Sequence, residues 1–149
     1  MKNKNIFSAG FTIIELIVII AIIAILATIV SASLMTYVSK SKNAAIKANM
    51  ASLQTYGGLY LTEEGNDDYS NLFNEDKSIN IISEITRVGG IVTMGANADN
   101  WCAKSNLIPL LGENKGNVPA FCVDSNGTKI EGRTGSLSCA ALTNWLCQQ

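Results

Sequence analysis

The sequence predicts an α+β fold in which one long N-terminal α-helix, with a membrane-spanning half and an amphipathic half, packs on a small antiparallel β-sheet domain. Two observations predict it. Residues 11–30 form an apolar block of twenty residues in which only Thr12, Glu15 and Thr28 are polar, and no proline follows before residue 109. The second half contains short apolar runs separated by Gly, Asn and Pro. The first pattern is typical of a helix and the second of strands joined by tight turns.

The chain of 149 residues has room for one globular domain besides this block. We expect four segments, namely a polar leader over 1–10, an apolar helix over 11–32, an amphipathic continuation of that helix over 33–62, and a β-rich globular domain over 63–149.

The composition disfavours both an enzyme and a nucleic-acid binder. The chain contains no histidine, which is the commonest general base and the commonest metal ligand. Its net charge is −1, without the basic surplus of proteins that bind DNA or RNA. We therefore predict no catalytic residues, no cofactor and no nucleic-acid partner.

The apolar block has the length of a membrane span. Twenty residues at 1.5 Å each make a helix of about 30 Å, which matches the hydrocarbon core of a bilayer. A secretory signal peptide is the alternative, with Ser31-Ala32-Ser33 as a small-residue cleavage site. Against it, the block is longer than a signal core and contains the acid Glu15. A carboxylate in a membrane helix costs about 2.5–3.5 kcal/mol, so it implies a cationic partner.

The stretch Gly10-Phe11-Thr12-Ile13-Ile14-Glu15-Leu16, after a leader with Lys2 and Lys4, resembles the processing signal of type IV pilins and pseudopilins. The resemblance implies that a prepilin peptidase cuts between Gly10 and Phe11 and N-methylates Phe11. It also implies that Glu15 pairs with the new N-terminus of a neighbouring subunit during assembly. The apolar helix then stays in the mature protein, first as a membrane anchor and later as the core of a filament.

The same resemblance implies a location and a set of partners. The N-terminus would be cytoplasmic, the helix would cross the inner membrane once, and the C-terminal domain would be periplasmic or extracellular before it joins a surface filament. Four cysteines favour an oxidising exterior. The expected partners are the prepilin peptidase, other pilin subunits of the same or another kind, an inner-membrane assembly platform, and the lipid bilayer before assembly.

The helix is expected to continue to about Leu61 with one apolar face. Spacings of 4, 3, 4 and 3 residues place one set of side chains on that face: Ile46, Met50, Leu53, Gly57 and Tyr60. A second set lies largely away from it: Lys40, Lys42, Lys47, Asn49 and Gln54. The three lysines are interpreted as a solvated or headgroup-facing surface. Because each glycine costs about 1 kcal/mol relative to alanine in a helix, Gly57-Gly58 predicts fraying or a stop.

The second half predicts an irregular connection over 69–80, a short helix or strand around Ile79–Ile85, and an antiparallel sheet. The expected strands are 91–94, 101–108, 120–124 and 128–131, with Asn126-Gly127 as a two-residue hairpin signal. The run Phe121-Cys122-Val123-Asp124-Ser125-Asn126-Gly127 also resembles a stretch of small bacterial pilin-like proteins. Trp101 and Trp145 are interpreted as core or interface anchors. Asp124, Asn126 and Thr128 are weak candidates for calcium ligands, against a plain hairpin.

The four cysteines are Cys102, Cys122, Cys139 and Cys147, and no C-x-x-C motif is present. We expect two disulfides, although free buried thiols are an alternative and three pairings are open. The preferred pairing joins Cys102 to Cys122 across adjacent strands and Cys139 to Cys147. The second of these resembles the disulfide-bounded loop that ends many pilins.

These features lead to three competing hypotheses of function. The first is a structural subunit of a type IV pilus or related filament. The second is a pseudopilin of a type II secretion or DNA-uptake system, which shares the same signal. The third is a monomeric binding domain that is membrane-anchored or secreted.

Overall fold

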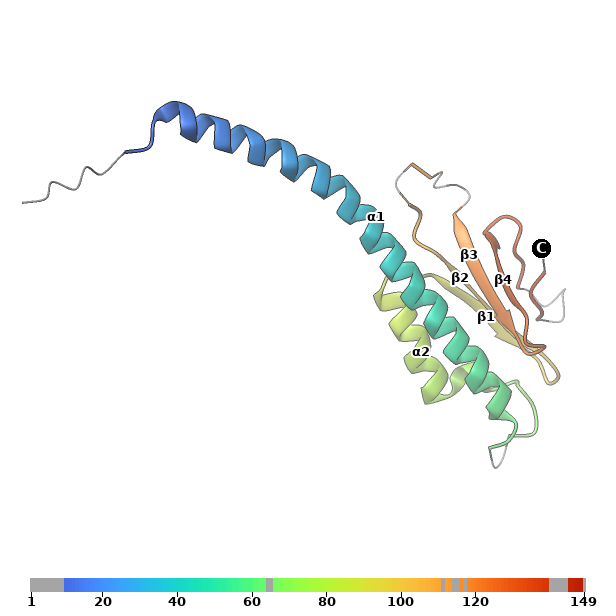
Figure 1. The fold of residues 1–149 in the computed structure, drawn as a ribbon. Coiled ribbons are helices and arrows are strands. Elements are labelled where there is room, and N and C mark those ends of the chain that lie inside the picture. The colour runs from blue at the N-terminus through green and yellow to red at the C-terminus, as the bar shows by residue number, and fades with distance from the viewer. Residues whose placement is uncertain are drawn as a thin grey trace, which may run out of the picture. The chain divides into compact units, whose positions relative to one another are not determined.

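The computed structural model describes residues 10–63, 66–110, 112, 113, 116, 118–139 and 145–148, apart from the side chain of Ala32. The described residues form two compact units, which divide between residues 35 and 36. The elements of the described part are α1 (Ile13–Tyr60), the 3₁₀ turn η1 (Leu72–Asn74), α2 (Asp76–Arg87), β1 (Val92–Ala96), β2 (Trp101–Asn106), β3 (Pro119–Asp124) and β4 (Lys129–Arg133) (Figure 1).

The expected long helix is present as α1, which begins at Ile13 and ends at Tyr60. Its first part belongs to the first unit and its second part to the second. In the second unit, the face predicted from the 4-3 spacing is buried: Ile46, Met50 and Leu53 expose 0% of their surface and Tyr60 exposes 1%. The prediction of an apolar helix face that packs against a sheet is therefore confirmed.

The glycine pair does not stop α1, because Gly57 has a packing role. A Cβ at Gly57 would overlap the indole ring of Trp101, whose side chain is fully buried on β2. The helix can approach the sheet this closely only where it lacks a side chain. Burial of the large Trp101 surface offsets the low helix propensity of Gly57.

The connection after α1 is shorter than the sequence suggested. The stretch expected to be irregular up to residue 80 already becomes helical at Asp76, where α2 begins. Asp76 in the first turn and Arg87 in the last turn both complement the helix dipole, which favours a helix of this length. Of the two structures left open around Ile79–Ile85, the helix is the one present. Its Ile85 is fully buried in the same apolar cluster as the inner face of α1.

The four strands form an antiparallel meander in the order β1-β2-β3-β4, with bounds close to the predicted runs. Alternate side chains point to opposite faces of the sheet. Trp101, Ala103 and Val123 join the cluster beneath α1 and α2. Cys102 and Cys122 belong to a second cluster, with Ala120, Leu137, Cys139 and Cys147. The sheet is thus covered by helices on one face and by the C-terminal segment on the other.

The turn between β3 and β4 is longer than the two-residue hairpin that Asn126-Gly127 suggested. The strand pairing closes at Val123 opposite Lys129, and the N–H of Gly127 donates to the carbonyl of Asp124 at 3.3 Å. A two-residue type I′ turn needs positive φ at both central residues. Gly127 has φ +83, but Asn126 is not among the described residues with positive φ. Asn126-Gly127 is therefore not a type I′ turn, and Ser125 and Asn126 are the central residues of the Asp124–Gly127 turn.

Gly57→Ala tests the close approach of α1 to Trp101. We expect this substitution to destabilise the protein by about 1–3 kcal/mol, because the new methyl group overpacks the core against the indole. Gly58→Ala is the matched control, since nothing lies within 4 Å of a Cβ at Gly58. The control should gain stability, by up to about 1 kcal/mol, from helix propensity alone. Urea unfolding followed by tryptophan fluorescence measures both, and equal effects of the two variants would contradict the packing argument.

Candidate functional site

The first candidate site is the apolar surface that runs from Phe11 along α1 to Met35, within the first unit. Its large apolar side chains expose between 43% and 78% of their surface. The segment is long and apolar enough to cross a membrane, and the most apolar window of α1 is not buried inside the protein. An exposed apolar surface of this extent is a site for lipid or for another protein.

The few hydroxyl groups of this surface are satisfied by the helix itself. Thr28 donates to the carbonyl of Ile25 at 2.7 Å, and Ser31 donates to that of Ala27 at 2.8 Å. Ser33 donates to the carbonyl of Ile29 at 3.3 Å. Because these hydroxyls already bond to the helix backbone, they do not need water as a partner. In apolar surroundings they would therefore keep their hydrogen bonds.

Glu15 is held at the start of α1 by Thr12. One oxygen of the Glu15 carboxylate accepts from the backbone N–H and from the hydroxyl of Thr12, both at 2.8 Å. The N–H of Glu15 in turn donates to the hydroxyl oxygen of Thr12 at 3.2 Å. This reciprocal pattern is a capping box, which satisfies donors that the first turn of a helix leaves open. The sequence interpretation missed the role of Thr12, although a Thr three residues before Glu at the start of an apolar run is its signature.

The bonds from Thr12 orient the carboxylate but do not neutralise it. Both donors are uncharged, and after Glu15 the sequence contains no Lys or Arg before Lys40. Gly10 and Phe11 precede the helix and are exposed. Exposed backbone outside a helix is the form in which a peptidase can reach a peptide bond. The predicted roles of Lys2 and Lys4 fall on residues outside the described part of the chain.

The disulfides join the C-terminal segment to the sheet, and the predicted pairing was wrong. The bridges are Cys102–Cys139 and Cys122–Cys147, so all four cysteines are oxidised. Cys102 lies on β2 and Cys122 on β3, and both lie on the sheet face that the C-terminal segment covers. Each sheet cysteine therefore bonds to a cysteine of the covering segment instead of to its neighbour on the sheet. Sequence separations of 37 and 25 residues correspond to about 3–4 kcal/mol per bridge.

Trp145 anchors this covering segment at the first strand of the sheet. A Cβ at Gly95, on β1, would overlap the Trp145 ring, so the indole lies directly against the backbone there. Trp145 itself is half-buried and packs against the disulfide cluster. Its interpretation as a packing anchor agrees with this position.

The second candidate site, the turn with Asp124, Asn126 and Thr128, is organised by backbone hydrogen bonds. The Asp124 side chain exposes 1% of its surface and accepts three N–H groups: from Asn126 at 3.0 Å, from Thr128 at 2.9 Å and from Cys147 at 3.0 Å. Both carboxylate oxygens are thereby engaged. Asp124 contacts Asn126 and Thr128 through their backbone N–H groups and not through their side-chain oxygens. Together with the bond from Cys147, these contacts tie the turn to the C-terminal segment.

Two side chains expected to face away from the packing surface of α1 in fact contact the sheet. The side-chain amide of Gln54 donates to the carbonyls of Asp124 at 3.2 Å and Thr128 at 2.9 Å. Lys47 forms an ion pair with Glu131 of β4 at 2.6 Å. Lys47 keeps 35% of its side chain exposed, so it is solvated as expected, but it also contacts the strand that passes beside α1.

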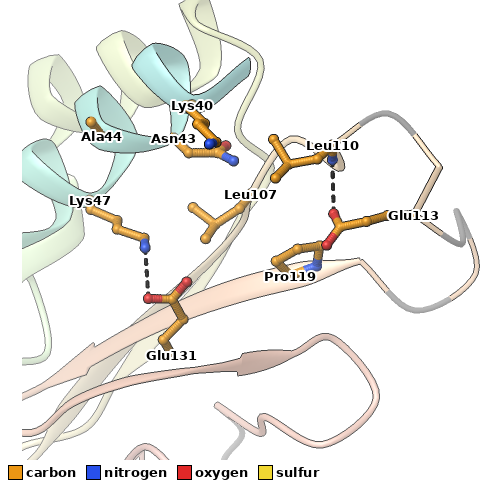
Figure 2. Close-up of a pocket in the computed structure, with 9 residues that line it drawn as sticks. All are labelled: Lys40, Asn43, Ala44, Lys47, Leu107, Leu110, Glu113, Pro119 and Glu131. Atoms are coloured by element: carbon orange, nitrogen blue, oxygen red, sulfur yellow. Dashed lines mark hydrogen bonds and ion pairs between the residues drawn. The ribbon is translucent and has the colours of Figure 1, made fainter. Parts of the chain in front are cut away.

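A groove opens beside this ion pair, between α1 and the start of β3 (Figure 2). Its volume is about 320 Å³ and Leu107 and Pro119 contribute apolar surface. Its charged side chains are two lysines and two glutamates, so their formal charges cancel. Lys47–Glu131 crosses it, and Glu113 accepts the N–H of Leu110 at 2.8 Å. The groove is lined by Lys40, Asn43, Ala44, Lys47, Leu107, Leu110, Glu113, Pro119 and Glu131.

Asn43 explains why the chain after β2 lies against α1. Its side-chain amide donates to the carbonyl of Ile108 at 2.9 Å, and its side-chain oxygen accepts the Ile108 N–H at 2.7 Å. These two bonds fix one wall of the groove and satisfy the backbone N–H and C=O of Ile108, which lies beyond the end of β2 and has no strand partner there. No sequence motif predicts this contact.

Comparison of the chain with protein-family models, with curated proteins and with solved structures found no match.

Asp124→Asn tests whether the turn is a clamp or a metal site. We expect a loss of about 1–3 kcal/mol, because the amide presents a donor where a backbone N–H needs an acceptor. Millimolar calcium should not shift the thermal midpoint of the unsubstituted protein. Asn126→Ala is the control, since the Asn126 side chain is exposed. Stabilisation by calcium that disappears in both variants would instead establish a metal site.

Proposed function

We propose that this chain is a structural subunit of a type IV pilus or related filament, cut between Gly10 and Phe11 and assembled through the apolar face of α1. The observation that carries the proposal is the combination at the start of the helix. An exposed, non-helical Gly10–Phe11 step immediately precedes an uncovered apolar helix whose only acid, Glu15, has no charged partner among the described residues.

The cut would supply the missing cation. A new α-amine at Phe11 lies four residues before Glu15. Four helical residues rise by about 6 Å, and since the helix begins only at Ile13, the separation along the axis is at least about that distance. A neighbouring helix displaced by about that distance would bring its amine level with the carboxylate. Since an unpaired charge in an apolar surrounding is costly, this register is favoured over others.

The second unit fits an exported subunit. Its two disulfides are stable in an oxidising compartment such as the periplasm or the cell surface. With the N-terminus in the cytoplasm, the helix would hold the protein in the inner membrane until a platform protein transfers it to the filament. The prepilin peptidase and other pilin subunits complete the proposed set of partners.

Mass analysis of the N-terminus of the membrane-bound protein tests the proposal directly. We expect a mature chain that begins at N-methylated Phe11, because the apolar segment has to remain as an anchor. Cleavage near Ala32 would contradict the proposal and would favour a secreted monomeric domain. Genes for a prepilin peptidase, an assembly ATPase and a platform protein beside this one would support it.

Glu15→Ala tests the role of the carboxylate. We expect cleavage and membrane insertion to persist, because the substitution removes a charge from an apolar helix. Assembly should fail, since the neighbour's amine would be buried without a counter-charge at about 3–5 kcal/mol per subunit. Glu15→Gln should be intermediate. The yield of sheared filaments, relative to mature protein in the membrane, is the measurement.

Thr12→Ala is the matched control for this experiment. It removes the capping partner of Glu15, at about 1 kcal/mol, but leaves the charge in place. Filaments should therefore still form. Normal filament yield from Glu15→Ala, or equal loss from both variants, would show that the charge of Glu15 is not what assembly requires.

A further inference from the structure

The outer strands of the sheet, β1 and β4, each have one side without a partner strand (Figure 1). In an antiparallel pair, alternate residues direct their N–H and C=O groups to the partner strand, and the residues between them direct theirs away from it. The hydrogen bonds at the ends of each pairing therefore identify the backbone groups of β1 and β4 that point outward.

On β1, the outward groups are unpaired. The N–H of Asn106 donates to the carbonyl of Ile91 at 3.0 Å, and the N–H of Asn97 donates to that of Asn100 at 2.8 Å. With the observed register, these two bonds turn the odd-numbered residues from 91 to 97 towards β2. The outward groups belong to three residues: Val92, Met94 and Ala96. Within the described part of the chain, no hydrogen bond reaches them, and we call this row the β1 edge.

On β4, the outward groups of Lys129 and Glu131 are unpaired in the same way. The N–H of Thr134 donates to the carbonyl of Val118 at 2.9 Å, which turns the even-numbered residues of β4 towards β3. Arg133 also points outward, but its carbonyl accepts from the turn that follows the strand. The backbone groups of Lys129 and Glu131, which we call the β4 edge, have no hydrogen bond among the described residues.

The two edges match in face and in direction. Val92 and Ala96 pack against the apolar cluster beneath the helices. Glu131 binds Lys47 of α1, so the side chains of the β4 edge also lie on the helix-covered face. β1 and β4 run in opposite directions, because three antiparallel pairings separate them. An antiparallel pairing of β4 in one copy with β1 in another therefore continues the sheet and keeps all helices on one face.

We propose that the β1 edge of one copy pairs with the β4 edge of a second copy, which deepens the filament proposal and rests on its membrane stage. In that stage every copy crosses the membrane in the same direction. Antiparallel pairing of a strand with the same strand of another copy needs a two-fold axis, which reverses one of the two copies. Pairing of β4 with β1 relates the copies by a translation and reverses neither. Such a heterologous contact can repeat from copy to copy.

The dimensions of the two layers allow the contact to repeat. Four strands about 4.8 Å apart occupy about 19 Å. The two helices on them, α1 and α2, need about 8–10 Å each, or about 16–20 Å together. The helix layer is therefore about as wide as the sheet that carries it, and the helices of neighbouring copies have room beside each other.

The contact satisfies backbone groups and covers one apolar side chain. Each outward pair of residues exchanges two hydrogen bonds, so the two residues of the β4 edge make four with the β1 edge. Met94 exposes 38% of its surface and lies opposite Lys129 or Glu131, whose aliphatic stems cover it. A contact of this size is weak between free molecules. It gains from the membrane, which holds the copies together at a high effective concentration.

Site-specific photo-cross-linking of the full chain in the membrane tests this contact. Met94→p-benzoylphenylalanine places a probe at the β1 edge, and mass spectrometry locates the residue that it captures. We expect links to residues 129–131 of a second, isotope-labelled copy. Gln148→p-benzoylphenylalanine is the control, because Gln148 is exposed in the segment that covers the other face of the sheet. The control should give no links to residues 129–131.

A proline in the labelled copy tests the backbone pairing itself. Lys129→Pro removes the outward N–H of that residue and leaves the bonds between β3 and β4 in place. We expect about tenfold fewer links to this copy, because the pairing loses one of its four hydrogen bonds. Lys129→Ala keeps the N–H and should be linked as well as the unsubstituted copy. Copies are compared at equal amounts of disulfide-bonded protein, so that a folding defect is not counted as a lost contact.

The outcomes separate this contact from the filament proposal. No link from position 94 to another copy overturns the contact, and so do links to β1 of another copy or to lipid alone. Unchanged linking to the Lys129→Pro copy, or equal loss with Lys129→Ala, overturns the backbone pairing. N-terminal cleavage and filament yield are measured on the same cells. Links to residues 129–131 without cleavage after Gly10 support the contact while the filament proposal fails, and filaments without links overturn the contact alone.

Discussion

An apolar helix that carries one carboxylate can be stable only where its whole circumference is covered and the charge is matched. The first part of α1 satisfies only its own hydrogen bonds, because Thr28, Ser31 and Ser33 bond to the helix backbone and Thr12 caps the first turn. The cover has to come from outside, from lipid or from other helices, and so does a cation that faces Glu15. The proposed processing step, membrane stage and filament stage are successive ways to meet that one constraint.

The second unit has to be stable in water, although the helix that enters it is apolar and uncovered in its first part. A sheet of four strands buries little surface by itself, so both of its faces need a cover. The helices cover one face, and Gly57 lets α1 come close enough to bury Trp101. The C-terminal segment covers the other through two disulfides, the clamp at Asp124 and the contact of Trp145 with Gly95. In both contacts a glycine makes room for an indole ring: Gly57 of α1 for Trp101 of the sheet, and Gly95 of the sheet for Trp145 of the C-terminal segment.

The features that could be predicted from the sequence are those with a local periodic signal. The apolar spacing from Ile46 to Tyr60 identified the buried face of α1, and β-rich runs between turn residues located the strands. Long-range pairings carry no such signal. Three pairings of the cysteines were open, and the choice depended on which sheet face the C-terminal segment crosses. Gln54 and Asn43 look like ordinary polar helix residues until the strand ends that they bond are known. The capping box of Thr12 and Glu15, by contrast, has a local signature and is predictable from the sequence.

The proposed pair between Glu15 and the amine of a neighbouring subunit differs from the ion pairs of the second unit in how it responds to salt. It would lie within apolar surroundings, where dissolved ions screen it little. The pair of Lys47 with Glu131 is partly exposed, and at 0.15 M ionic strength exposed charges interact over about 8 Å. Rising salt should therefore weaken the exposed pair and leave the register between adjacent helices unchanged, because that register depends on charges that are shielded from water.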